Sequence, residues 1–170
     1  NIVGKNRWKY SNFRSVSIGQ GEVQMTPLQM ANLAALIANR GYYIQPHVIR
    51  TGNDTLLPIN SGIDAVYFEP VIEGMQLVVD AGTARRAFTK GITICGKTGT
   101  VENNKGKDHS VFIAFAPREN PKIALACIVE NSGNYGGTWA APIVSMMIEK
   151  YLNGVLSDYT KKYKEPRILE

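Results

Sequence analysis

The hydrophobic residues of this chain recur at helical spacing in some segments and form continuous apolar, β-branched runs in others. The segment "TPLQMANLAALIANRG" has helical spacing and predicts a helix over about Pro27–Asn39. Thr26 is its expected N-cap, Gln29 completes a capping box, and Gly41 suits the C-terminal cap. One face of this helix carries only small side chains, so another element can pack closely there: Ala31, Ala34, Ala35 and Ala38.

Three further helices are predicted after it. The segment "EPVIEGMQLVVDAG" has Pro70 near its start and Gly82 past its end, which are typical helix boundaries. "TARRAF" predicts a short third helix, and an amphipathic pattern predicts a last helix over about Trp139–Leu152. The first stretch, to about Gln24, is polar and rich in turn residues.

Three strand signals follow one another at about Thr93–Val101, Val111–Ala116 and Ile123–Glu130. The connections "NNKGKD" and "PRENP" are short and turn-like, so an antiparallel meander is expected. The segment "GYYIQPHVIR" predicts a short edge strand, because Pro46 cannot donate to a ladder, and residues 51–65 are expected to be a loop. The predicted fold class is α/β (α+β), with an antiparallel sheet edge covered by helices.

The first strand raises a chemical question, because "ITICGKTGTVENN" places Lys97 inside an apolar run. An unpaired ammonium is costly to bury, so this lysine needs a partner. One interpretation is a phosphate-binding loop, since Gly91, Gly96, Lys97 and Thr98 fit the pattern G-x-x-x-x-G-K-[ST]. The context disfavours this interpretation, because the four residues between the glycines form a strand and "TVENNKG" cannot begin a good helix.

The other interpretation is an edge strand beside a binding site. Thr98 and Thr100 share one face of the strand, where their hydroxyls can hold an anion. Lys97 leaves from the other face, but its long stem can bring the ammonium toward the same site. Gly99 is expected to make room where another element approaches, and free strand amides can pair with an extended substrate.

These residues and their neighbours resemble the transpeptidase domain of penicillin-binding proteins, for which K-T-G is one of three signatures. "SIGQGEVQMTPLQMANLAALIANRG", "AGTARRAF", "GKTGT", "DHSVFIAFAP" and "NYGGTWAAPI" look like segments of that family and stand in the family's order. The resemblance runs from about Ser17 to Leu152. Among subgroups it is closest to elongation-type class B enzymes, the penicillin-binding protein 2 kind.

The resemblance implies roles for the strand residues. Lys97 and Thr100 would be catalytic: Lys97 supports proton traffic and electrostatics at a serine, and the Thr100 amide is half of the oxyanion hole. Thr98, Gly99 and Thr100 would bind substrate, with both hydroxyls on the terminal carboxylate of a D-Ala-D-Ala stem peptide or of a β-lactam. No cofactor and no metal are expected.

The family's nucleophile opens a Ser-x-x-Lys motif, and no serine here has a lysine three residues later. Ser132-Gly133-Asn134 fits the second motif, Ser-x-Asn, but follows the K-T-G strand instead of preceding it. We therefore expect residues 1–170 to be the C-terminal portion of one transpeptidase domain, with a core over 17–152 and a basic tail over 153–170. The isolated chain would be inactive.

The expected partners are the N-terminal half of the same protein, peptidoglycan stem peptides, β-lactams and cell-wall elongation proteins. The expected location is the periplasmic face of the bacterial inner membrane, with the anchor outside this chain. Two alternatives stay open: a β-lactamase or β-lactam sensor of the same fold, and a non-catalytic peptide-binding module.

Composition adds limits to this interpretation. The chain is 44% hydrophobic over 170 residues, enough for one domain with a core, and no run approaches the roughly 20 apolar residues of a membrane span. The net charge of +5 includes the tail "KKYKEPR", interpreted as solvated surface, with contact to anionic lipid or polymer as the alternative. Basic and aromatic residues do not interleave, which disfavours nucleic acid as a partner.

The two cysteines, Cys95 and Cys127, lack metal-site spacing and are interpreted as small buried hydrophobes. They lie on the first and third strands, so their Cα atoms are expected about 10 Å apart, beyond disulfide reach.

The remaining polar residues have mainly structural interpretations. His109 is expected to be a hydrogen-bonded structural histidine, with orientation of the site wall as the alternative, and His47 is expected at the surface. Arg85 and Arg86 line either a substrate groove or a solvated helix face. A structural role in a turn shaped by Gly19 and Gly21 is expected for the polar pair Gln20 and Glu22.

Overall fold

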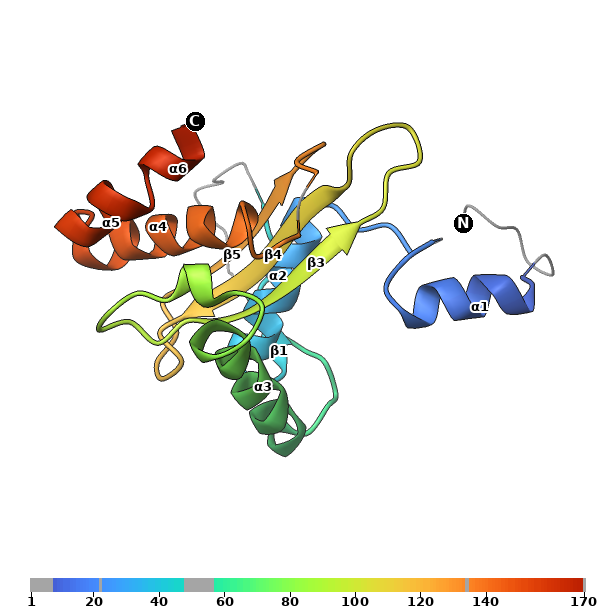
Figure 1. The fold of residues 1–170 in the computed structure, drawn as a ribbon. Helices are drawn as coiled ribbons and strands as arrows, with labels where there is room; N and C mark the ends of the chain where they lie inside the picture. Colours follow the sequence, from blue (N-terminus) through green and yellow to red (C-terminus); the bar gives the residue numbers. More distant parts are fainter. Residues whose placement is uncertain (1–7, 22, 48–56, 134, 170) are drawn as a thin grey trace.

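The computed structural model describes residues 8–21, 23–47, 57–133 and 135–169 (Figure 1). Its centre is an antiparallel sheet of β3 (Cys95–Val101), β4 (His109–Ala116) and β5 (Ile123–Val129), in the order β3-β4-β5. The predicted meander is confirmed, with boundaries that move by one or two residues. Both connections are short, as antiparallel neighbours allow.

The register of the ladder decides which side chains share a face. Thr98 lies opposite Phe112, which lies opposite Cys127, whereas Cys95 lies opposite Phe115. Helix α4 (Ala140–Asn153) packs against β4 and β5 on the Phe112 face. Helices α2 (Pro27–Ala38) and α3 (Phe68–Asp80) pack on the Phe115 face. The sheet is therefore the middle of three layers, as Figure 1 shows.

Each face of the sheet has its own hydrophobic core. The α4 face buries eleven residues together: Val79, Ala84, Ala87, Ile94, Phe112, Ala114, Ala116, Ala140, Ala141, Val144 and Ile148. The α2 and α3 face buries a smaller group: Ala38, Phe68, Ile72, Met75, Cys95 and Phe115. Full burial of a side chain as large as Phe112 stabilises a fold by about 1.5–3 kcal/mol, so the two cores hold the sheet between the helices of its two faces.

The helices begin where the sequence predicts. The Thr26 hydroxyl accepts from the Gln29 amide at 3.3 Å, and Gln29 Oε1 accepts from the Thr26 amide at 2.8 Å, which confirms the capping box. Helix α2 ends at Ala38 with Asn39 as its cap. "TARRAF" forms a single 3-10 turn, η2 (Arg85–Ala87), and α4 is capped by Gly154, which has a left-handed φ of 75°.

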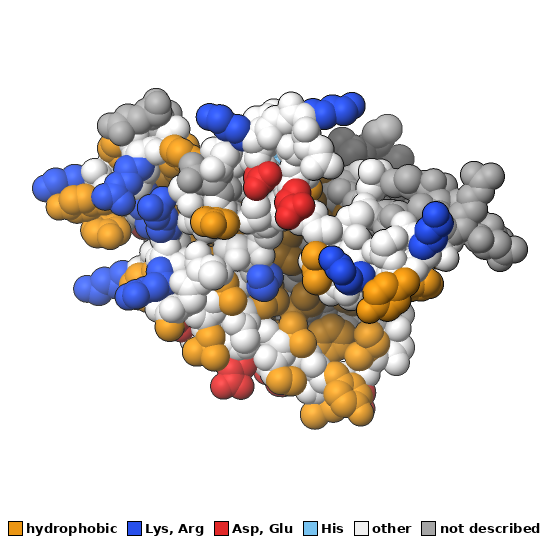
Figure 2. Space-filling view, turned by 45° about the vertical axis from the view of Figure 1, so that its right-hand side comes forward, with side chains coloured by type: hydrophobic (Ala, Val, Ile, Leu, Met, Phe, Trp, Pro, Cys, Tyr) orange, Lys and Arg blue, Asp and Glu red, His pale blue; other side chains and the backbone are white. Residues whose placement is uncertain are grey.

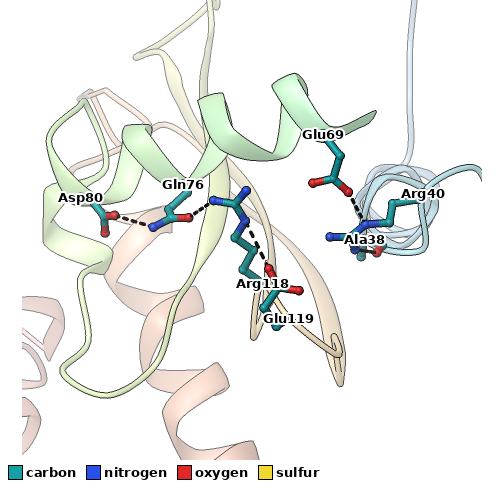
Figure 3. A network of polar contacts seen from close by, with 7 residues as sticks. All are labelled: Ala38, Arg40, Glu69, Gln76, Asp80, Arg118 and Glu119. Atoms are coloured by element: carbon teal, nitrogen blue, oxygen red, sulfur yellow. Dashed lines mark hydrogen bonds and ion pairs between the residues drawn. The ribbon is translucent and has the colours of Figure 1, made fainter. Parts of the chain in front are cut away.

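A polar network ties α3 to both of its neighbours (Figure 3). Arg40, at the end of α2, forms an ion pair with Glu69 in the first turn of α3. Arg118, in the turn between β4 and β5, donates to the Gln76 side chain, which donates to Asp80. These contacts fix α3 against the sheet edge that carries β3.

The N-terminal third differs from the prediction. Helix α1 (Tyr10–Ser17) occupies the stretch expected to be turn-rich, and none of its residues is buried. The expected edge strand is β1 (Tyr42–Tyr43), which pairs with β2 (Ile59–Asn60) in a separate two-stranded sheet. The predicted loop, 51–65, contains β2 and ends where the 3-10 turn η1 (Ala65–Tyr67) begins, while positions 48–56 lie outside the described residues.

The C-terminal tail is folded, with α5 (Asp158–Tyr163) and α6 (Pro166–Leu169). Lys164 is buried, and its Nζ donates to Phe88 O, Thr89 Oγ1 and Ser145 Oγ at 2.9, 3.2 and 3.0 Å. The solvated interpretation is therefore wrong for Lys164, although Lys161 and Lys162 are exposed. Lysine is a surface residue by default, and only the three acceptors from distant segments make its burial possible.

Cys95 and Cys127 are both free, as predicted. The ladder explains this, because Cys95 pairs with Phe115 while Cys127 pairs with Phe112, three residues along the intervening strand. Burial raises the pKa of the Cys95 thiol to about 11, so the group stays protonated and behaves as a small hydrophobe.

Gly96→Ala should destabilise the fold by about 1–3 kcal/mol, the usual scale of overpacking in a core. A Cβ at this position would lie 2.3 Å from Phe112 Cζ and 3.0 Å from Ile113 O. Gly74→Ala is the matched control, because nothing lies within 4 Å of its Cβ in α3, and it should stabilise by about 0.5–1 kcal/mol. Urea denaturation measures both, and equal midpoints for Gly96→Ala and the unchanged protein would contradict the packing argument.

Lys164 should make stability depend on pH above neutrality. Burial lowers its pKa from 10.5 to about 8, although Glu149 opposes the shift. Between these values the unfolded chain binds more protons than the folded one, so stability rises with pH across this window. The free energy of unfolding should therefore gain about 2–3 kcal/mol from pH 8 to 10.5 relative to Lys164→Met.

Urea denaturation at a series of pH values checks this expectation. Lys161→Met is the control, since Lys161 is exposed on α5, the helix that Lys164 caps, and its curve should run parallel to that of the unchanged protein. Parallel curves for Lys164→Met and the unchanged protein would show that Lys164 does not have this pKa.

Candidate functional site

The Lys97-Thr98-Gly99-Thr100 segment lies on β3, at the edge of the three-stranded sheet. β3 pairs with β4 on one side, and within the described ranges no strand pairs with its other side. An edge strand presents backbone donors and acceptors that another extended chain can use. The site therefore begins with an open edge.

Two carbonyls of β3 mark the direction of this edge. Thr98 O accepts from Lys97 Nζ at 2.8 Å, and Thr100 O accepts from Gln20 Nε2 at 3.0 Å. Carbonyls two residues apart lean toward the same side of a strand, and here side chains, not a strand, supply both donors. These contacts indicate that Thr98 and Thr100 turn their backbone groups toward the open edge.

Lys97 answers the question that its place in the strand raises. Its ammonium is exposed and folds back to the strand itself, bonding the Thr98 carbonyl. Among the described residues, no carboxylate forms an ion pair with it. An ammonium with a single carbonyl partner at an open edge is available to a negatively charged ligand or to a nucleophile brought from elsewhere.

Thr98 and Thr100 share the α4 face of the sheet, as the alternation predicts. The Thr98 hydroxyl lies 2.8 Å from the Thr83 hydroxyl, whereas the described part of the chain supplies no hydrogen bond to the Thr100 hydroxyl. Thr83 was not singled out from the sequence, because a lone threonine between α3 and η2 carries no spacing signal. It fixes the direction of the Thr98 hydroxyl.

Gly136 and Gly137, in the loop after β5, lie directly against the backbone around Gly99 and Thr83. A Cβ on Gly136 would lie 2.4 Å from Gly99 O and 2.3 Å from Val111 O, and a Cβ on Gly137 would lie 2.0 Å from Thr83 O. Only residues without side chains allow the loop to lie directly on these backbones. Because the loop reaches both Thr83 and β3, it holds the two threonine hydroxyls in one place.

The expected role of Gly99 in making room is wrong. A Cβ on Gly99 would point toward Val111 at 3.5 Å, an ordinary contact distance. The close approach comes from the opposite face, and the glycines that permit it are Gly136 and Gly137. Position 99 is therefore not constrained by this crowding, and the substrate-binding role assigned to it stays a prediction.

The phosphate-loop interpretation fails on local structure. Gly96, Lys97 and Thr98 all lie inside β3, and the chain then turns into β4 without forming a helix. Gly91 stands in the tight turn between the bridged pair Thr89 and Ile92. A phosphate loop needs backbone amides gathered at a helix N-terminus, which this segment lacks.

The other polar candidates have structural contacts. His109 Nδ1 accepts from the Asn131 amide at 2.9 Å, which confirms it as a hydrogen-bonded structural histidine. Ser132 donates to Asp108 O at 3.3 Å, and Asn134 lies outside the described residues. His47 is exposed, as expected.

The turn before α2 has the predicted shape, with φ of 79° at Gly19 and 85° at Gly21. Gln20 does more than hold this turn, because its side chain reaches Thr100 O on β3. Glu22 lies outside the described residues. Arg85 and Arg86 are exposed in η2, and Arg86 donates to Thr138 O at 3.4 Å.

Among the described helices, none has the length and hydropathy that a bilayer crossing requires. The same residues contain no group of three or more potential metal ligands.

Comparison with known proteins identifies the kind of domain to which this site belongs. The family model described as "Penicillin binding protein transpeptidase domain" matches residues 1–149. The peptidoglycan D,D-transpeptidase MrdA of Haemophilus influenzae is 33% identical across 95% of this chain and 29% of that protein. The peptidoglycan D,D-transpeptidase PbpA of Mycobacterium tuberculosis is 36% identical across 81% of this chain and 31% of that protein.

Solved structures agree with these relatives. Pseudomonas aeruginosa PBP2 in complex with WCK 5153 matches with a TM-score of 0.73 and 34% identity, over 94% of this chain and 36% of that one. Penicillin-binding protein A of M. tuberculosis, solved as an imipenem acyl-enzyme complex, matches with a TM-score of 0.72 and 31% identity, over 81% and 33%. The predicted fold class is confirmed.

The chain spans about a quarter to a third of the length of the curated relatives it matches, from 25% to 31%. The relatives named above are of the penicillin-binding protein 2 type, which agrees with the subgroup that the sequence resembles. With the family model covering most of its length, the chain belongs to the family of penicillin-binding protein transpeptidase domains.

Proposed function

We propose that this chain supplies the substrate-binding strand of a peptidoglycan D,D-transpeptidase that cross-links stem peptides through a serine acyl-enzyme and is inhibited by β-lactams. The observation that carries the proposal is the open edge of β3, where Lys97 and the hydroxyls of Thr98 and Thr100 stand beside backbone groups that pair with no strand among the described residues. The peptidoglycan D,D-transpeptidases to which the chain is similar support the reaction class.

The substrate fits this edge as an additional strand. A stem peptide ending in D-Ala-D-Ala would run along β3 and pair with its backbone, as in β-augmentation. Its terminal carboxylate would accept hydrogen bonds from the Thr98 and Thr100 hydroxyls. The Thr83 contact is compatible with this pose when Thr83 is the donor, because the Thr98 hydroxyl then keeps its proton for the carboxylate.

The chemistry requires a serine from outside this chain. Its Oγ would attack the carbonyl of the penultimate D-Ala, and the carbonyl electrons would move to the oxygen. The Thr100 amide and the amide of the serine would stabilise that oxyanion, a contact of the kind that contributes about 3–4 kcal/mol per donor. Collapse breaks the C–N bond, and the terminal D-Ala leaves as an amine after taking a proton.

The acyl group then passes to the amine of a second stem peptide, which forms the cross-link and frees the serine. Lys97 would lower the energy of charged states at the serine and assist its proton transfers. A β-lactam would follow the same first step, with its ring amide as the bond that breaks. The imipenem, penicillin G and other acyl-enzyme complexes of the M. tuberculosis relative support this part of the proposal.

The serine and its lysine would come from the N-terminal half of the same domain, of which residues 1–170 form the remaining portion. The length of the relatives supports this proposal, since each is at least three times as long as the match. We place the whole protein at the periplasmic face of the bacterial inner membrane, where peptidoglycan is cross-linked, with cell-wall elongation proteins as further partners.

Thr100→Val in the full-length protein should slow acylation by fluorescent penicillin about 5- to 150-fold, because a hydrogen bond to a charged group contributes about 1–3 kcal/mol. Thr100→Ser keeps the hydroxyl and should restore most of the rate. Thr93→Val is the control, since Thr93 is exposed just before β3 and its rate should not change. Unchanged acylation of Thr100→Val would remove Thr100 from carboxylate binding.

The isolated 170-residue chain should stay unlabelled by fluorescent penicillin after denaturation. Covalent capture needs a nucleophile with a base beside it, and no serine of the chain precedes a lysine by three positions. Adding the N-terminal half should restore labelling of that half. Labelling mapped to a serine of this chain would overturn the division of the site between the two halves.

The same labelled protein distinguishes the alternatives. A transpeptidase keeps its penicillin acyl group for a long time, whereas a β-lactamase would release it quickly and turn over the drug. A non-catalytic peptide-binding module would never become labelled, even at full length.

A further inference from the structure

A hollow of about 520 Å³ lies between η2, the start of α4 and the two C-terminal helices, away from the open edge of β3. Its charged lining consists of Arg85, Arg86, Lys164 and Arg167, and none of the acidic residues that the structure describes lines it. Figure 2 shows Lys and Arg side chains gathered, with hydrophobic ones between them, at the end of the molecule where α5 and α6 lie. The volume is within the range of about 300–1,000 Å³ that small-molecule sites occupy.

The positive charge of this hollow is not balanced within the described residues. Lys164 is committed, because it makes three hydrogen bonds and has Glu149 as its electrostatic partner. The three arginines form no ion pair in the part of the chain that the structure describes. Neighbouring cations raise each other's energy, and an anion among them reverses the sign of that interaction.

Four aromatic side chains form much of the remaining lining, beside Thr138, Pro142 and Ile168. Phe88, Trp139, Tyr159 and Tyr163 all border the hollow. Trp139 also has a buried indole N–H, Nε1, with no hydrogen-bond partner in the described residues. A buried donor without an acceptor is destabilising by about 1–3 kcal/mol, so the structure carries an unsatisfied polar group in a residue of the lining.

From the geometry we infer that this hollow binds a small aromatic carboxylate. The carboxylate would accept from the arginine guanidiniums, whose planar forks suit two oxygens, and the flat apolar group would stack among the rings. A phosphate alone would leave the aromatic lining unused, and a neutral aromatic would leave the arginines uncompensated. The inference does not depend on the proposed transpeptidase function.

The hollow is linked to β3 by one short segment. Arg85, Arg86 and Phe88 of this segment line the hollow, and Lys164 donates a hydrogen bond to the Phe88 carbonyl. Thr83 stands just before η2 in the same segment, and its hydroxyl forms a hydrogen bond with the Thr98 hydroxyl. A ligand in the hollow therefore contacts the segment that orients a residue of the candidate site.

Isothermal titration calorimetry of the full-length protein with 2-naphthoate tests the inference by measuring the dissociation constant. We expect measurable binding of 2-naphthoate, and at least tenfold weaker binding of 2-naphthamide, which keeps the ring system and removes the charge. The double variant Arg85→Gln, Arg86→Gln should weaken 2-naphthoate binding at least tenfold. Lys161→Gln is the control, since it removes an exposed charge of α5 outside the lining, and should bind normally.

Titration after saturation with penicillin separates the two sites. Protein that is fully acylated, or that proves unable to react with penicillin, should still bind 2-naphthoate with the same affinity. Equal affinity for the carboxylate and the amide, no effect of the arginine changes, or loss of binding after acylation would each overturn the inference. Since the carboxylate and amide are compared on unchanged protein, the test holds even if a variant fails to fold.

Discussion

The arrangement of the candidate site depends on direct backbone contact between β3 and the loop that precedes α4. Gly136 lies on the backbone of Gly99 and Val111, and Gly137 lies against Thr83, at distances that exclude any side chain. The loop thus places the segment before η2 beside the strand, and the hydroxyls of Thr83 and Thr98 meet as a result. Steric fit, not charge, sets the position of the polar groups here.

Close packing also restricts which side chains fit on the two faces of β3. The Phe112 ring occupies the volume that a side chain at position 96 would need. On the opposite face, Cys95 and Phe115 belong to the core beneath α3, which the Arg118 and Arg40 contacts hold in place. β3 is therefore fixed on both faces and on one edge, and its remaining edge is the direction in which a ligand can approach.

The sequence predicts the parts of the fold whose information is local. Helix α2 carries its own cap in Thr26 and Gln29, and the meander follows from three apolar runs joined by short turns. The alternation along β3 likewise predicts that Thr98 and Thr100 share a face. Helix α1 escapes prediction because it buries nothing, and the folded tail escapes because Lys164 finds its acceptors more than seventy residues away, at Phe88 and Thr89.

In the candidate site, too, the sequence predicts the features that local residues determine and not those that contacts between distant segments determine. Lys97 stands out because a charge inside a strand is unusual, but the role of Thr83 depends on a fifteen-residue separation that no spacing rule contains. The sequence singles out Gly99 because it lies within the Lys-Thr-Gly-Thr motif. The close backbone packing instead requires Gly136 and Gly137, which lie in the loop before α4. Contacts between segments decide both cases, and a single sequence does not show them.

The hydrogen bonds to the carbonyls of Thr98 and Thr100 have a consequence for association between molecules. A bare edge strand is a template on which the strand of another molecule can add, and long open edges promote aggregation for that reason. The side chains of Lys97 and Gln20 donate to two carbonyls of this edge. Lys97 has a long side chain, and Gln20 lies in a loop. A specific ligand that offers better donors can displace these two side chains. A strand of another molecule that arrives by chance finds the two carbonyls already hydrogen-bonded.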